Sequence, residues 1–277
     1  MKMNDYIDDF SNHLREAIEI ANNTSLTSCT KEIRNVLICG LGGSGIGGTI
    51  VSDIISPKVN IPIAATKDYS IPNFVNEHTL VIANSYSGNT EETLYALEKC
   101  QSRAAEIAVI TSGGKLKAIA EENKYNKIII PGNQPPRAMF GYAFTELFFM
   151  LNHYGIIDDS FKSDFTKAIE LLDTEKSDIQ EQAMSLAKKM YKQTPVIYVA
   201  NGFEGVAVRF RQQINENSKM LCWHHVVPEM NHNELLGWRT NVNDLAVVYL
   251  RNKSDYDRNQ IRIDINKKVI AKFTENI

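Results

Sequence analysis

Two short segments rich in glycine and hydroxyl side chains have the composition of phosphate-binding turns. Residues 40–48 read GLGGSGIGG, and residues 85–93 read SYSGNTEET. Each segment follows an apolar run typical of a buried strand, at residues 36–39 and 79–83, and precedes a stretch with helical periodicity. The free N–H groups and the positive dipole end of a helix that starts there suit a dianionic phosphate.

Hydroxyl groups supply the specific donors in both turns. Ser44 lies in the first turn, and Ser85, Ser87 and Thr90 lie in the second. The second turn contains no Lys or Arg, and the chain has no Gly-Lys-Ser/Thr motif of the Walker type. This composition argues against a nucleoside triphosphate and favours the compact phosphate of a small metabolite, although one such turn alone would also fit an ordinary capped helix.

The first turn also satisfies the dinucleotide pattern G-x-G-x-x-G through Gly40, Gly42 and Gly45, so a dinucleotide-dependent oxidoreductase is an alternative. Against it, the turn contains a serine, and Asp68, the candidate ribose ligand, lies beyond the end of the next apolar run. A second phosphate-type turn also follows one βα unit later. Two such turns at the carboxyl ends of parallel strands can bind one sugar phosphate between them.

Strand and helix patterns alternate along the chain, which predicts an α/β fold with parallel sheets flanked by helices. A break near residues 154–160 divides it into a first lobe, residues 1–154, and a second lobe, residues 155–277. The first lobe is expected to contain helices at 5–22, 45–55, 91–102, 115–122 and 139–153 and strands at 36–39, 61–65, 79–83, 107–110 and 127–130. The second is expected to contain helical stretches at 161–191, 203–218 and 255–272 and strands or extended segments at 196–200, 222–227 and 245–250.

The composition fits a cytoplasmic enzyme. The 277 residues are 43% hydrophobic and 23% charged, with a net charge of −3, so no basic field for nucleic acid is expected. No apolar run reaches about 18 residues, and the N-terminus MKMNDYIDDF lacks the apolar core of a signal peptide, so neither a membrane span nor a leader is expected. The four cysteines are scattered without metal-binding spacing and are expected to be reduced.

Several further motifs carry a resemblance to a known family. The two turns resemble those of the sugar isomerase (SIS) domain. Residues 134–137 read QPPR, residues 215–219 read NENSK and residues 228–234 read PEMNHNE. That set, in that order, resembles the bifunctional phosphoglucose/phosphomannose isomerases from about residue 33 to about residue 250. The resemblance implies two SIS lobes, with the phosphate of a hexose bound by Gly43, Ser44, Ser85, Ser87 and Thr90.

Arg137 follows two prolines and precedes an apolar helical stretch. The prolines restrict the chain that enters the helix, and a cation at a helix start is unfavourable unless it has an anionic partner. The resemblance implies that Arg137 stabilises an enediolate.

Glu216 and His232 complete the candidate chemistry. Aldose–ketose isomerisation moves a proton between C1 and C2 and needs a base, a group that opens the sugar ring and a donor that steadies the enediolate. The resemblance makes Glu216 the base and His232 the ring-opening group, donated by the neighbouring subunit of a homodimer with active sites at its interface. A zinc site of His224, His225 and His232 is an alternative that no HxxE helix or CxxC motif supports, so no metal and no cofactor are expected.

Family members usually continue for some tens of residues beyond the region that resembles this chain. The second lobe is therefore expected to be either incomplete at its C-terminal end or compact, which leaves the preference between glucose and mannose open.

Together these features predict an isomerase that interconverts glucose 6-phosphate, and mannose 6-phosphate as well, with fructose 6-phosphate. A regulatory SIS module that binds a sugar phosphate without catalysis is the alternative, because binding needs only the hydroxyl-rich turns.

Overall fold

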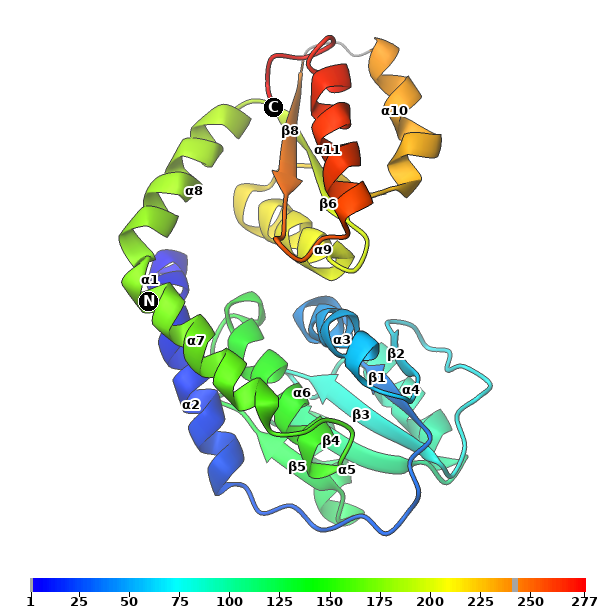
Figure 1. Cartoon of the computed structure of the whole chain (residues 1–277). Helices are drawn as coiled ribbons and strands as arrows, with labels where there is room; N and C mark the ends of the chain where they lie inside the picture. Colours follow the sequence, from blue (N-terminus) through cyan, green and yellow to red (C-terminus); the bar gives the residue numbers. More distant parts are fainter. Residues whose placement is uncertain (1, 241–243) are drawn as a thin grey trace. The chain divides into compact units, whose positions relative to one another are not determined.

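The computed structural model describes residues 2–240 and 244–277, and the chain divides into two compact units. The first unit ends at Thr174, and the second comprises Glu175–Ile277. Each contains one parallel β-sheet flanked by helices (Figure 1), which confirms the predicted fold class. No helix in the described part of the chain is long and apolar enough to cross a membrane.

The first unit is built on a five-stranded parallel sheet in the order β2-β1-β3-β4-β5. The strands are β1 Asn35–Cys39, β2 Ile63–Thr66, β3 Thr79–Ser85, β4 Glu106–Thr111 and β5 Asn126–Ile129. Its helices are α1 Met3–Asp8, α2 Phe10–Asn23, α3 Gly42–Ile55, α4 Glu91–Gln101, α5 Gly114–Glu122, α6 Phe140–His153 and α7 Ser160–Thr174, with short turns η1 Ser56–Lys58 and η2 Pro136–Ala138. The expected single helix at 5–22 is wrong, because the chain leaves helical geometry at Asp9.

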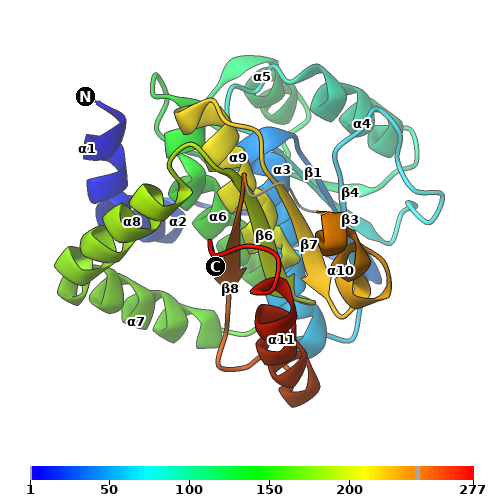
Figure 2. The same cartoon turned by 90° about the horizontal axis from the view of Figure 1, so that it is seen from above.

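Helices cover both faces of this sheet, so its strands are apolar on both sides. Ile38 and Ile82 point to the face that α2, α3, α6 and α7 cover, whereas Leu37 and Val81 point to the face under α4 and α5. Figure 2 shows α4 and α5 together, apart from α2, α6 and α7. This doubly covered sheet explains why the strands could be recognised as uninterrupted apolar runs.

Helix α7 packs with the first unit, although the expected boundary lay before it, at residues 154 and 155. Phe161 and Phe165 enter the core that α6 shares with the sheet, and the rings of Phe161 and Phe148 stack with centroids 5.7 Å apart. The compact unit therefore extends to Thr174.

The second unit has a three-stranded parallel sheet in the order β7-β6-β8. The strands are β6 Thr194–Ala200, β7 Trp223–Val227 and β8 Leu245–Leu250. The helices are α8 Lys176–Met190, α9 Glu204–Gln213, α10 Glu234–Gly237 and α11 Asp257–Ile270, with tighter or wider turns η3 Ile214–Ser218, η4 Glu229–His232 and η5 Trp238–Thr240. The helical stretch expected at 161–191 is thus two helices, and the one expected at 203–218 ends early in a π-helical turn.

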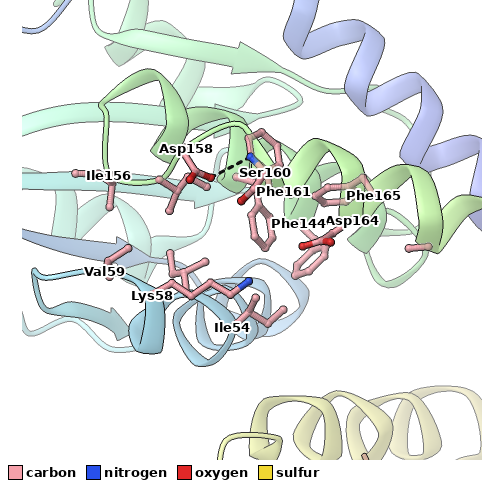
Figure 3. Close-up of a pocket in the computed structure, with 14 residues that line it drawn as sticks. Ile54, Lys58, Val59, Phe144, Ile156, Asp158, Ser160, Phe161, Asp164 and Phe165 are labelled. Atoms are coloured by element: carbon pink, nitrogen blue, oxygen red, sulfur yellow. Dashed lines mark hydrogen bonds between the residues drawn. The ribbon is translucent and has the colours of Figure 1, made fainter. Parts of the chain in front are cut away.

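A pocket of about 330 Å³ lies near the C-terminal end of α3, against α6 and α7 (Figure 3). Phenylalanine and isoleucine side chains line most of it, and Lys58, Asp158 and Asp164 add charges. The hydroxyl-rich turns precede or begin α3 and α4, so this pocket is separated from the first turn by the length of α3.

Glu146, in the middle of α6, predicts a pH-dependent stability. Its side chain is fully buried, and neither carboxyl oxygen has a hydrogen-bond partner among the described residues. Burial raises its pKa to about 8. Because the folded protein holds this proton more tightly than the unfolded chain does, stability is greatest below the unfolded pKa and falls as pH rises through about 8.

We therefore expect the wild-type protein to lose on the order of a few kcal/mol of stability between acidic and alkaline pH, and we expect Glu146→Gln to abolish that loss. Urea unfolding at a series of pH values measures it, with the exposed Glu122→Gln as the control. Equal pH dependence in the two variants would mean that Glu146 does not titrate in this range.

Candidate active site

The two hydroxyl-rich turns lie side by side at one edge of the first unit's sheet. They leave the carboxyl ends of β1 and β3, which pair in parallel with Cys39 opposite Ala83. The strand order reverses at this point, because β2 lies on one side of β1 and β3 on the other. Such a reversal is where open α/β sheets bind ligands.

Two glycines allow close backbone contacts at the first turn, one with β3 and one within the turn itself. A Cβ atom on Gly40 would lie 2.7 Å from the carbonyl oxygen of Asn84, and one on Gly45 would lie 2.4 Å from the carbonyl oxygen of Gly40. Both distances are too short for a Cβ atom, so only glycine fits at either position. Two of the three glycines in the dinucleotide pattern, Gly40 and Gly45, therefore have a steric explanation that involves no dinucleotide.

Hydrogen bonds connect and orient the hydroxyl groups. The N–H of Tyr86 donates to Ser44 Oγ at 3.2 Å, so the second turn is bonded to the first. Ser85 Oγ lies 2.9 Å from Thr90 Oγ1, and Ser87 Oγ accepts from the N–H of Asn89 at 3.2 Å. Because Ser44 and Ser87 accept from backbone groups, their hydroxyl hydrogens can be donated to an anion. Ser87 is exposed, whereas Ser44 and Ser85 are buried.

Both turns end in helix N-termini. Helix α4 begins at Glu91, as expected, but α3 begins at Gly42 instead of residue 45. Gly43 and Ser44 are therefore in the first turn of α3, where backbone N–H groups have no partner within the helix. All five predicted phosphate ligands, from Gly43 to Thr90, lie at this edge of the sheet, which thus offers N–H groups, hydroxyls and two positive dipole ends.

Lys67 is a cation that the sequence interpretation missed. It follows β2, which pairs with β1 so that Thr66 lies opposite Cys39. A Cβ atom on Gly45 would lie 3.2 Å from Lys67 Cγ, so this side chain lies against the first turn. Only the pairing of β2 with β1, which the sequence does not reveal, brings it there.

Arg137 lies in the short turn η2, which leads into α6, and is partly buried. The segment before it is bonded to the second turn, because the N–H of Gln134 donates to the phenolic oxygen of Tyr86 at 3.0 Å. The first unit thus brings the arginine-bearing segment and both turns together.

Glu216 lies in the second unit, exposed, in the π-helical turn that follows α9. Asn215 Nδ2 donates to the carbonyl oxygen of Met220 at 2.6 Å, and Lys219 has a left-handed φ of 57°, which together end the helix. Burial lowers the pKa of Arg209, and the charge of Glu216 opposes that change. Single π-helical turns are frequent at functional sites.

His232 is exposed at the end of η4, also in the second unit. The neighbouring histidines have other partners: His225 Nδ1 lies 2.9 Å from a carboxylate oxygen of Glu234, and His224 Nε2 lies 3.4 Å from one of Glu204. Among the residues that the structure describes, no three His, Cys, Asp or Glu side chains are grouped as metal ligands. Glu234 also accepts from Tyr198 and Trp223, a cluster that sequence spacing gave no sign of.

Comparisons with known proteins agree with this architecture. The SIS domain model matches residues 32–154, and the model of the bacterial phospho-glucose isomerase C-terminal SIS domain matches residues 179–277. Two solved structures share the fold: the C-terminal domain of glucosamine-fructose-6-phosphate aminotransferase from Francisella tularensis and glucosamine-6-phosphate deaminase from Thermotoga maritima. Their TM-scores are 0.75 and 0.72, at 12% and 16% identity, covering 98% and 99% of this chain and 80% and 83% of theirs.

Curated relatives are more similar in sequence. The chain is 38% identical to the bifunctional phosphoglucose/phosphomannose isomerase of Caldicellulosiruptor bescii, over 93% of this chain and 79% of the relative. It is 34% identical to the enzyme of the same name from Aquifex aeolicus, over 87% and 74%. It is also 34% identical to a D-glucosamine-6-phosphate 4-epimerase of Sulfolobus acidocaldarius, over 74% and 64%. By its sequence and its two SIS domains, the chain belongs to the bifunctional phosphoglucose/phosphomannose isomerase family.

Proposed function

We propose that this protein interconverts glucose 6-phosphate and mannose 6-phosphate with fructose 6-phosphate. The observation that carries the proposal is the edge of the first unit's sheet, where two helix N-termini and the hydroxyls of Ser44 and Ser87 meet the segment that bears Arg137. Such a group can bind a phosphate dianion through N–H and hydroxyl donors, on a unit that also carries a guanidinium able to stabilise charge that develops on the sugar.

The reaction is a proton transfer within one molecule. In this proposal His232 moves a proton at the ring oxygen, which opens the sugar. Glu216 then removes the proton from C2 of the aldose and returns it to C1, through a cis-enediolate whose oxygen charge Arg137 stabilises. The aldose and the ketose are isomers, so no oxidant or reductant is consumed.

Two other functions fit particular observations. A non-catalytic module that binds sugar phosphates would need only the turns of the first unit. Epimerisation of an amino sugar phosphate at C4 is suggested by the relative from Sulfolobus acidocaldarius, whose name describes that reaction. The presence of Glu216, His232 and Arg137 favours isomerisation over binding alone, because a binding module has no use for a base. The greater number of relatives named as isomerases favours isomerisation over C4 epimerisation.

One experiment separates the three functions. The protein is incubated in deuterated water with fructose 6-phosphate, or separately with glucosamine 6-phosphate, and the products are followed by NMR. We expect glucose 6-phosphate and mannose 6-phosphate that carry deuterium at C2. Binding without conversion would indicate a module, and a C4 epimer of glucosamine 6-phosphate would indicate an epimerase.

We also propose a homodimer, in which His232 acts on the substrate of the neighbouring subunit. Mixing inactive Glu216→Gln protein with inactive His232→Ala protein is then expected to restore part of the activity, because hybrid dimers contain one intact set of residues. Sedimentation measures the assembly, and a monomer that is active at every concentration would refute this part of the proposal.

A further inference from the structure

Tyr86 joins three segments around the candidate phosphate site. Its N–H donates to Ser44 Oγ at 3.2 Å in the first turn. Its carbonyl oxygen accepts from both the N–H and the hydroxyl of Ser112, at 3.0 and 2.6 Å, in the turn after β4. The backbone of Tyr86 therefore fixes the second turn relative to its two neighbours, and its side chain remains to make another contact.

That contact is with Gln134, which is held from two sides. The N–H of Gln134 donates to the phenolic oxygen of Tyr86 at 3.0 Å. The side-chain oxygen of Gln134 accepts from the hydroxyl of Tyr6. Tyr6 is the buried residue of α1, only 8% exposed, so the N-terminal helix contributes directly to this arrangement.

The chain between Gln134 and Arg137 has little freedom. Pro135 and Pro136 have restricted φ angles, and η2 is closed by hydrogen bonds from Ala138 N–H to the Pro135 oxygen and from Met139 N–H to the Pro136 oxygen, at 2.9 and 3.2 Å. A displacement of Gln134 would therefore be passed to the backbone of Arg137. Burial raises the pKa of Tyr86, so its phenol stays a neutral hydroxyl where it accepts from Gln134.

We propose that Tyr6 and Tyr86 are positioning residues, which hold Gln134 and thereby set Arg137 relative to the turn that binds the phosphate. This inference rests on the proposed isomerase function. It assigns a role in turnover to two tyrosines outside the predicted site, one of them 128 residues from Gln134 in the chain. If the two tyrosines had a purely structural role, their substitution would change the stability of the protein and leave kcat unchanged.

Tyr6→Phe and Tyr86→Phe test the proposal, since each removes one hydroxyl and keeps the ring. Tyr125→Phe is the matched control: its hydroxyl accepts from Gln101 Nε2 at 3.0 Å, and it precedes β5 at the opposite edge of the same sheet. We expect kcat to fall about 10-fold in each test variant, with KM within about two-fold of the wild-type value, because the phosphate turn stays intact. The control is expected to keep its kcat and to lose as much thermal stability as the test variants.

A double-mutant cycle makes the test specific. In a Gln134→Ala background the partner of Tyr6 is already gone, so adding Tyr6→Phe is expected to have no further effect on kcat. Adding Tyr125→Phe to the same background should change stability as it does in the wild type. Full additivity of Tyr6→Phe with Gln134→Ala would overturn the role of Gln134.

A measurement independent of catalysis completes the test. Amide hydrogen exchange of the peptide 130–140 is expected to accelerate in Tyr6→Phe and Tyr86→Phe and to stay unchanged in Tyr125→Phe. A wild-type protein that cannot isomerise sugar phosphates would refute the proposed function. An active wild type whose kcat and exchange are unchanged in both tyrosine variants would refute the positioning role instead.

Discussion

Glu216→Gln is expected to lower turnover of fructose 6-phosphate by at least about 100-fold while sugar-phosphate binding is largely kept. The amide keeps the size of the side chain but cannot accept the substrate proton at neutral pH. Local structure should survive, because Asn215 and the left-handed backbone of Lys219 end the π-helical turn and glutamine fills the same volume as glutamate. The guanidinium of Arg209 also keeps Gln213 as a hydrogen-bond partner in this variant, because the side-chain oxygen of Gln213 can face it at 2.8 Å.

Steady-state kinetics measure the loss of turnover, and calorimetry with an open-chain hexitol 6-phosphate measures binding. Glu181→Gln, an exposed change in α8 of the same unit, is the control and should have wild-type kinetics. Solvent deuterium that still enters C2 at the normal rate in Glu216→Gln would show that another group is the base.

The strands could be predicted because both faces of the first sheet are covered. The strand β3 is buried at each of its residues, and residues 80–83 at its centre form an apolar run that is visible in the sequence. The turns could be predicted because a strand that ends in glycine and hydroxyl residues before a helix is a local pattern. These turns follow neighbouring parallel strands, so the phosphate ligands predicted in them lie together at one edge of the sheet.

Features that depend on contacts distant in the chain could not be predicted. Helix α3 begins within a glycine-rich segment of poor helix propensity, where Asn84 Nδ2 from β3 donates to the carbonyl oxygen of Ser44 at 3.2 Å. Lys67 reaches the site only because β2 pairs with β1, and Tyr6 only because α1 packs on η2. Local periodicity contains neither fact, and the same holds for the aromatic contacts that join α7 to the first unit.

Gly88 holds the second turn close to the turn after β4. A residue without a Cβ atom lets another group approach its backbone closely. In the structure the approaching group is part of the chain: a Cβ atom on Gly88 would lie 1.8 Å from the carbonyl oxygen of Gly113 and 2.8 Å from Thr111 Oγ1. Gly88 also has a φ of +66°, and its own carbonyl accepts from the N–H of Leu116 at 2.9 Å. The second turn is thus interlocked with the turn after β4.

Gly88→Ala is therefore expected to weaken fructose 6-phosphate binding by about 100-fold or more. It is also expected to lower the free energy of unfolding by roughly 3–5 kcal/mol. The methyl group cannot coexist with the Gly113 oxygen, so the two turns must separate, and the hydroxyls of Ser85 and Ser87 move with them.

Gly155→Ala is the matched control: its φ of +69° is similar, but a Cβ atom there meets nothing within 4 Å. That change should cost about 1 kcal/mol and leave binding intact, because only backbone strain is added. Urea unfolding and calorimetric titration measure both quantities. If the two alanine variants bind and unfold alike, contact with Gly113 is not what requires glycine at position 88, and the interlocked turns do not shape the phosphate site.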